Sequence, residues 1–207
     1  TPQKRPAGWK VKIIERDITE DCFTYNRRLK FGFNPDFINY KAVIYIDGSI
    51  RIKKKLNVVM NWCETKNFNF SASKHYLEHT INDEIKHINK LNKAKGDEST
   101  FLKDFEYVKD INKSILFENG VFIRKIHANN ILLHQKFSTA VTEVLFKYRS
   151  RDQIILPVIF KKLNLKMTVF PYGFRESSSP FALKLHVNES QNLNILQKIK
   201  FWIRKKF

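Results

Sequence analysis

The stretch AVIYIDGSIRIKKKL, residues 42–56, is the clearest structural signal in the chain. An apolar run leads to Asp47-Gly48-Ser49, which has the composition of a tight turn, and a second run with alternating apolar residues follows it. Two short apolar runs on either side of such a turn are typical of a β-hairpin. The pattern therefore predicts two antiparallel strands here and favours a fold rich in short strands.

The second run of this stretch has an unusual distribution of charge. Successive side chains of a strand point to opposite faces, so Ile50 and Ile52 are expected on one face and Arg51, Lys53 and Lys55 on the other. Like charges beside one another repel. The row of cations is either a solvated face that keeps the sheet soluble or a surface that binds an acidic partner.

Composition limits the class of protein. The chain has 207 residues, of which 43% are hydrophobic, and it contains 18 Phe, which is enough to bury a core. The net charge of +18 favours polyanionic partners, whether acidic protein segments, nucleic acid or an anionic surface. Both halves share this charge: residues 1–97 hold 19 Lys and Arg against 11 Asp and Glu, and residues 98–207 hold 19 against 9. No apolar run approaches the length of a membrane span.

The first half reads as a series of short strands followed by one helix. From residue 71 to residue 95, apolar residues recur every three or four positions, which predicts a long amphipathic helix with Ile81 and Ile85 on its buried face. The segment 93–100 is polar and contains a glycine, so it is expected to be a boundary. The predicted strands of this half are 9–16, 22–33, 37–46, 49–56, 57–62 and 66–70.

The second half repeats this plan. It opens with SILFENGVFIRKI (114–126), where Asn119-Gly120 is the strongest short hairpin signal. It closes with a predicted helix that begins at Asn188. The strands expected between them are 130–137, 140–149, 153–160, 163–170 and 180–187. We therefore predict an α+β fold of two tandem units, 1–97 and 98–207, each with about six antiparallel strands followed by a C-terminal helix.

Motifs that carry catalysis or bind metal are not evident. The chain has no glycine-rich phosphate loop, no nucleophile elbow and no zinc-binding sequence. His75 and His79 have a spacing that can bind metal but lack an evident third ligand, and Cys22 and Cys63 are not spaced as a zinc site. The acidic cluster at 17–21 is interpreted as a solvated turn. A binding module without metal or cofactor is expected, rather than an enzyme.

Two stretches together carry a family resemblance. AVIYIDGSIRIKKK (42–55) and SILFENGVFIRKIHANNILLHQ (114–135) each resemble the strand–turn–strand centre of a polo box. The polo-box unit is a six-stranded antiparallel sheet followed by a helix, the order predicted above for each half. A contiguous, strongly basic pair is most similar to the cryptic polo box of the kinases that drive centriole duplication, in the form of a divergent nematode member.

This resemblance implies a function. The chain would be a non-catalytic homodimer that recruits a serine/threonine kinase, whose catalytic domain lies outside it, to centrioles or centrosomes in the cytoplasm. It would do so by binding an acidic segment of a centriolar scaffold protein, without membrane contact. The residues predicted to bind that segment are Arg27, Arg28, Lys30, Arg51, Lys53, Lys55, Lys147, Arg149, Arg151, Lys161, Lys162 and Lys166.

Two other functions stay open from the sequence alone. A nucleic-acid-binding β-rich module is the main alternative, since the positive charge would also permit it. Its best support is FTYNRRLKFGF (23–33), where aromatic and basic residues interleave, although the aromatic residues at spacing two are expected in the core. The other is an enzyme whose site is assembled from residues far apart in the sequence.

Overall fold

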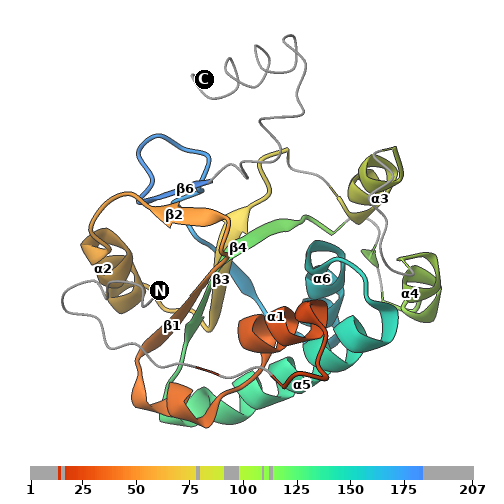
Figure 1. Ribbon diagram of the computed structural model, residues 1–207, viewed down its shortest axis with the longest axis horizontal. Helices are drawn as coiled ribbons and strands as arrows, with labels where there is room; N and C mark the ends of the chain where they lie inside the picture. Colours follow the sequence, from red (N-terminus) through yellow and green to blue (C-terminus); the bar gives the residue numbers. More distant parts are fainter. Residues whose placement is uncertain are drawn as a thin grey trace.

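The computed structural model describes residues 14, 17–77, 80–90, 98–108, 110–111 and 114–183, which form a mixed α and β fold (Figure 1). The helices are α1 (Cys22–Phe31), α2 (Asn57–Thr65), α3 (Ile81–Lys90), α4 (Glu98–Asp104), α5 (Ile131–Tyr148) and α6 (Asp152–Lys162). The strands are β1 (Ala42–Ile46), β2 (Ile50–Ile52), β3 (Phe70–Lys74), β4 (Phe117–Lys125), β5 (Met167–Val169) and β6 (Phe181–Leu183).

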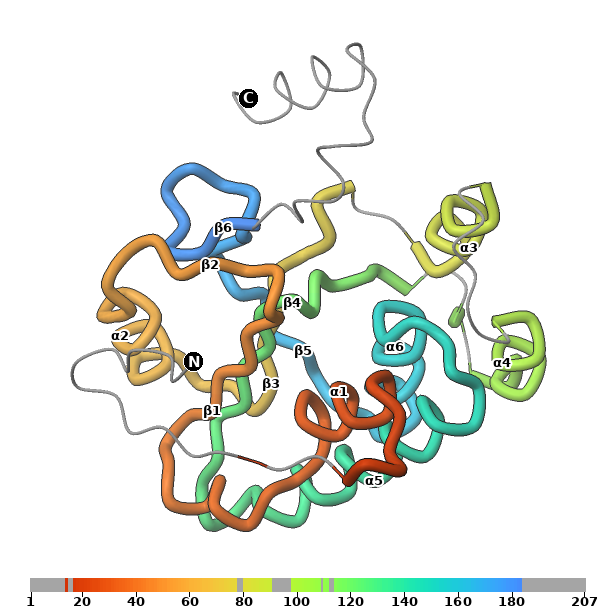
Figure 2. The backbone as a smooth tube through the Cα atoms, in the orientation of Figure 1, coloured from red at the N-terminus to blue at the C-terminus, as the bar shows by residue number. Residues whose placement is uncertain are grey.

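The main sheet has four strands in the order β1-β4-β3-β5. Strand β4 is antiparallel to both of its neighbours, whereas β3 and β5 are parallel. Strands β2 and β6 form a separate two-stranded antiparallel pair. Figure 2 shows that β1 and β4, far apart in the sequence, lie side by side. Each sheet therefore joins strands from both predicted units, and the expected pair of six-stranded antiparallel sheets is not found in the described residues.

The predicted hairpin at 42–56 was correct in its turn and wrong in its pairing. The backbone N–H of Ile50 donates to the carbonyl of Asp47 at 2.8 Å, which closes the turn. The strand before the turn, β1, pairs with β4, and the strand after it, β2, pairs with β6. A turn sequence fixes only the local reversal of the chain, and here the two arms separate to join different sheets.

The Asn119-Gly120 dipeptide does not form a turn between two strands, as predicted, but lies inside β4. Ala72 of β3 is opposite Phe122, yet the next residue, Ser73, is opposite Glu118. The intervening residues of β4 therefore bulge out of the pairing with β3. Bulges re-aim side chains and occur often beside functional sites.

A glycine at position 120 suits a crowded part of the fold. A Cβ atom at Gly120 would lie 2.6 Å from the Cδ1 atom of Ile50 and 3.1 Å from a ring carbon of Phe174. The backbone N–H of Asp47 also donates to the Gly120 carbonyl at 2.8 Å. The bulge is thus held against the turn between β1 and β2.

Two hydrophobic cores cover the two faces of the main sheet. Phe122 of β4 belongs to the larger core, which packs against α1, α5 and α6, and its neighbours Val121 and Ile123 belong to the smaller core under α2 and the β2–β6 pair. Figure 1 shows α1, α5 and α6 on one side of the sheet and α2 on the other. This alternation along β4 follows from the period of two in a strand.

The larger core contains an arginine. Arg124 is 2% exposed and has no carboxylate partner among the described residues; its guanidinium donates to the carbonyls of Lys30 and Gly32 and to the hydroxyl of Ser138, each at 3.1 Å. The two carbonyls lie at the C-terminal end of α1, where helices leave acceptors unbonded. Arg124 thus ties α1 to the sheet, and burial lowers its pKa to about 9.

Several predicted strands are helices. The ranges 22–33 and 57–62 fall mainly in α1 and α2, and 130–137, 140–149 and 153–160 fall in α5 and α6. Helix α6 is buried on nearly every side, so its residues are apolar without a helical period. A short apolar run of this kind does not distinguish a buried strand from a buried helix.

The helix predicted over 71–95 is partly correct. Residues 70–74 form β3, and helix α3 begins only at Ile81. Ile81 and Ile88 are fully buried, and Ile85 is partly buried against the same core. The final predicted helix, from Asn188, lies outside the described residues, as does most of the predicted boundary at 93–100.

Candidate functional site

The twelve predicted partner-binding residues fall into two groups. In the first group the charge is paired with a carboxylate of the same chain; its members are Arg27, Arg28, Lys30, Lys147, Arg149 and Arg151. The side chains of the second group are exposed. Within it, Arg51, Lys53 and Lys55 make no ion pair with a carboxylate of the described residues. Its members are Arg51, Lys53, Lys55, Lys161, Lys162 and Lys166.

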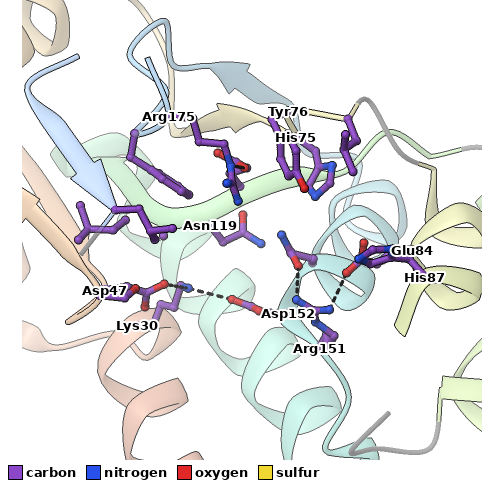
Figure 3. Close-up of a pocket in the computed structure, with 18 of the residues that line it drawn as sticks. Lys30, Asp47, His75, Tyr76, Glu84, His87, Asn119, Arg151, Asp152 and Arg175 are labelled. Carbon is purple, nitrogen blue, oxygen red and sulfur yellow. Dashed lines mark hydrogen bonds and ion pairs between the residues drawn. The ribbon is translucent and has the colours of Figure 1, made fainter. Parts of the chain in front are cut away.

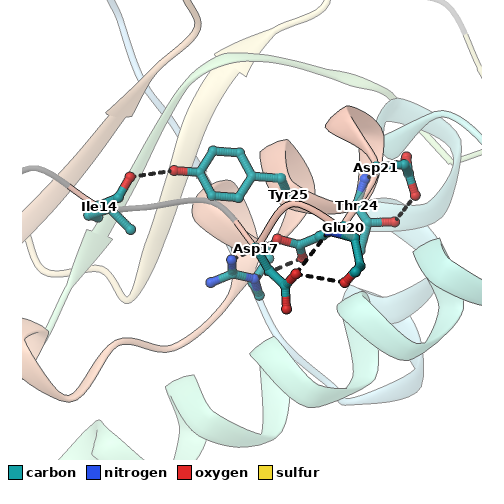
Figure 4. A network of polar contacts seen from close by, with 8 residues as sticks. Ile14, Asp17, Glu20, Asp21, Thr24 and Tyr25 are labelled. Atoms are coloured by element: carbon teal, nitrogen blue, oxygen red, sulfur yellow. Dashed lines mark hydrogen bonds and ion pairs between the residues drawn. The ribbon is translucent and has the colours of Figure 1, made fainter.

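Two arginines of the first group hold the start of α1. Arg28 binds both oxygens of Glu20, at 3.0 and 2.8 Å, and Arg149 binds both oxygens of Asp21, at 3.1 and 3.3 Å. Asp21 also accepts from two backbone N–H groups and so caps the helix (Figure 4). Arg149 and these other donors hold the pKa of Asp21 well below its usual range. The acidic cluster at 17–21 therefore forms a turn that leads into helix α1, with Asp21 as the cap.

Lys147, in the last turn of α5, has a similar role. Its ammonium lies 3.1 Å from the carboxylate of Asp104, which also accepts a hydrogen bond from the hydroxyl of Tyr148. This contact joins the last turn of α5 to the end of α4. The Lys147 charge is thus engaged in packing two helices together.

Arg27 and Lys30 form a buried ionic cluster between α1 and α6. The Lys30 ammonium lies 2.9 Å from Asp152 and 3.5 Å from Asp47, and Arg27 lies 3.3 Å from Asp152. Lys30 is 3% exposed. Burial by itself would raise the pKa of Asp152, but the two cations lower it to about 2. Asp152 is therefore ionised at neutral pH.

This cluster forms one wall of a cleft of about 410 Å³ (Figure 3). The cleft lies where α1, the turn after β1, the end of β3, α3, the β4 bulge and the start of α6 converge. Its volume is within the usual range for sites that hold small molecules. We call it the Asn119 cleft, after the amide at its centre.

The other charged side chains of the Asn119 cleft are paired as well. Arg151 lies 2.7 Å from Glu84, and Arg175 lies 2.8 Å from Glu118. Burial raises the pKa of Glu118, and Arg175 acts against that rise. Four carboxylates thus face four basic side chains, so the walls carry little net charge.

Of the twelve residues predicted to bind a partner, only Arg27, Lys30 and Arg151 line this cleft, and they were predicted to bind an acidic segment. Its carboxylates and Asn119 were missed because they come from segments spread over the chain. The one signal at this place was the Asn119-Gly120 dipeptide, which was interpreted as a turn.

The exposed cations at 51–55 have a defined backbone. Arg51 is opposite Ala182 in the β2–β6 pair, and the backbone N–H of Lys53 donates to the carbonyl of Pro180 at 2.7 Å. Between Lys53 and Lys55, the Lys54 ammonium donates to the Ser178 carbonyl at 3.0 Å. Lys54 is thus attached to the loop before β6, and it is exposed, as are Lys53 and Lys55 on either side.

The remaining cations of the second group lie at the end of α6 and before β5. Lys161 donates to the carbonyl of Asp110 at 2.9 Å, and the Lys162 ammonium lies 5.4 Å from the centre of the Phe105 ring. Lys166 is exposed in the loop that follows. These three residues do not join the Asn119 cleft.

In the described part of the chain, no group of three or more His, Cys, Asp and Glu side chains is arranged to hold a metal ion. None of the described helices is long and apolar enough to cross a membrane. Comparison with models of protein families, with curated proteins and with solved structures finds no match for this chain.

Proposed function

We propose that the chain is a non-catalytic binding module that captures an acidic protein segment on the surface formed by Arg51, Lys53 and Lys55, named here the β2 basic surface. The observation that carries the proposal is that these three side chains are exposed and, unlike half of the predicted set, form no ion pair with a described carboxylate. Their charge is available to a partner.

The β2 basic surface is ordered before any partner arrives. Pairing of β2 with β6 and the bond from Lys53 to Pro180 fix its backbone. A surface that is already ordered loses less conformational entropy on binding. Like charges on it repel one another, and a segment rich in Asp and Glu would replace that repulsion by attraction and speed association.

The polo-box resemblance supports a more specific proposal. On this proposal the acidic segment belongs to a centriolar scaffold protein, the chain targets a serine/threonine kinase to centrioles, and it acts as a homodimer. The main sheet offers one physical support for self-association, since β1 and β5 are its edge strands in the described residues. Near β1, Ile38 and Tyr40 are more than half exposed.

The experiment compares two triple variants with opposite expectations. The variant R51E/K53E/K55E reverses the β2 basic surface, and K86E/K90E/K103E makes the same change of charge on exposed lysines of α3 and α4. Both are titrated with a fluorescent peptide rich in Asp and Glu. We expect the first variant to lose more than tenfold in affinity and the control to lose much less. Equal losses would show that only net charge matters.

Nucleic acid is tested in the same assay with labelled duplex DNA. The stretch that favoured it, 23–33, lies mostly in helix α1 and not in an exposed strand, and its Phe31 is fully buried. Tighter binding of DNA than of the acidic peptide, lost in R51E/K53E/K55E, would overturn the proposal in favour of a nucleic-acid-binding module.

A further inference from the structure

Asn119 is a buried amide without hydrogen bonds to the described residues. Its side chain lines the Asn119 cleft, the residue is 3% exposed, and neither its Nδ2 nor its Oδ1 atom has a partner. Buried polar groups in native proteins are nearly always hydrogen-bonded, because a buried group without a partner loses its bonds to water and gains none. An exception at the centre of a cleft points to a ligand that would supply the missing bonds.

The backbone around Asn119 is built to present this amide. Asn119 is the first residue of the β4 bulge, which the Asp47–Gly120 hydrogen bond holds in place. Figure 3 shows its side chain between the wall of Tyr76 and Arg175 and the wall of Asp47 and Lys30. The backbone that carries the amide is thus held in place.

The charges around the amide indicate what kind of ligand would fit. Each carboxylate of the cleft has a basic partner. A charged ligand would therefore have to break one of these ion pairs before it could form an ion pair with the protein. A neutral ligand avoids this loss. To satisfy both atoms of Asn119 at once, it must carry a hydrogen-bond donor beside an acceptor.

The wall of the cleft formed by Tyr76 and Arg175 favours a flat ligand. Tyr76 is 52% exposed, and the guanidinium of Arg175 lies 3.9 Å from the centre of its ring. Aromatic rings and guanidinium planes are surfaces on which planar heterocycles stack. This wall is therefore suited to a planar ligand.

We propose that the Asn119 cleft binds a small neutral ligand that is planar and carries a hydrogen-bond donor beside an acceptor. Adenine presents such an edge, and so does an aromatic carboxamide. Asparagine pairs with adenine in this bidentate manner in nucleic-acid complexes. The cleft shares no lining residue with Arg51, Lys53 and Lys55, and the proposal does not depend on the acidic partner.

Calorimetric titration of the full chain tests the proposal with two pairs of probes. Adenosine is compared with purine riboside, which lacks the amino donor, and nicotinamide with methyl nicotinate, which lacks the amide N–H. We expect the first member of at least one pair to bind about 5- to 150-fold more tightly than the second. No binding of adenosine or nicotinamide, or equal binding within both pairs, would overturn the proposal.

A variant and its matched control separate binding from folding. Asn119→Leu should keep or raise the melting temperature, because it removes an unbonded amide, and should abolish probe binding. Asn130 is also buried, but its side chain makes three hydrogen bonds, with Asn69, Lys125 and His127. Asn130→Leu should therefore melt at a lower temperature. If Asn119→Leu unfolds, the comparison of probes in the unaltered chain decides the proposal alone, because it is independent of this variant.

Discussion

The ammonium of Lys30 lies 2.9 Å from the carboxylate of Asp152, and both side chains are almost completely buried. This pair joins α1 to the start of α6. Removing one member leaves the other charge buried, so Lys30→Met should lower the free energy of unfolding by about 3 kcal/mol. Replacing both, as Lys30→Met with Asp152→Leu, should cost less than the sum of the two single changes. Urea denaturation of all four proteins measures this coupling, and strictly additive losses would contradict it.

The buried Arg124 should be needed for stability. Arg124→Met keeps much of the apolar packing but leaves the carbonyls of Lys30 and Gly32 and the hydroxyl of Ser138 without their donor. We expect a loss of about 2 kcal/mol in the free energy of unfolding.

The control for Arg124 is Arg51→Met, which removes an arginine from the exposed face of β2. An exposed substitution should change stability by less than about 0.5 kcal/mol. Equal denaturation midpoints for the two variants would show that the Arg124 contacts add nothing to stability.

Acid should destabilise the fold through His134. Its side chain is fully buried, and burial lowers its pKa from 6.5 to about 4. Between these values the unfolded chain binds a proton that the folded chain does not, so the free energy of unfolding should fall as the pH falls from 6.5 toward 4. The full loss is about 3 kcal/mol.

Denaturation at several pH values between about 5 and 7, where most carboxylates stay ionised, isolates this effect. The slope should flatten in His134→Gln. It should persist in His87→Gln, which alters an exposed histidine of α3. A wild-type slope that His134→Gln leaves unchanged would assign the acid sensitivity to other groups.

Self-association is tested by light scattering. The proposed homodimer should give twice the chain mass of 24.6 kDa at high concentration. If β1 pairs with its copy, a proline at Ala42 should shift the mass toward the monomer, because the backbone N–H of Ala42 faces away from β4 and proline removes this donor from the edge strand. A monomer mass for the unaltered chain at every concentration would remove this proposal.

The sequence predicted the mixed composition of the fold and some local features. The turn at Asp47-Gly48, a strand over part of 37–46 and the buried position of Ile81 all appear in the structure. Each depends on a local pattern. Strand partners depend on contacts between distant segments, and the hairpin interpretation of residues 42–56 failed for that reason.

Helix α6 was predicted as a strand because its residues are apolar on nearly every side. In α6, the run QIILPVIF (153–160), predicted as a strand, is almost entirely buried, and Pro157 lies inside the helix. The Asn119 cleft could not be predicted from the sequence for another reason. Its residues come from six or more separate segments, and only the folded chain shows that Lys30 faces Asp152 or that Asn119 lacks a partner.

The central claim is that the exposed cations at Arg51, Lys53 and Lys55 attract an acidic segment. The most direct measurement is the affinity for the Asp- and Glu-rich peptide between about 0.1 and 1 M salt, a range over which the screening length falls from about 10 Å to about 3 Å. The account predicts a steep fall in wild-type affinity and a much shallower one in R51E/K53E/K55E, because the variant lacks the charges that salt would screen. Parallel salt dependences in the two proteins would contradict it.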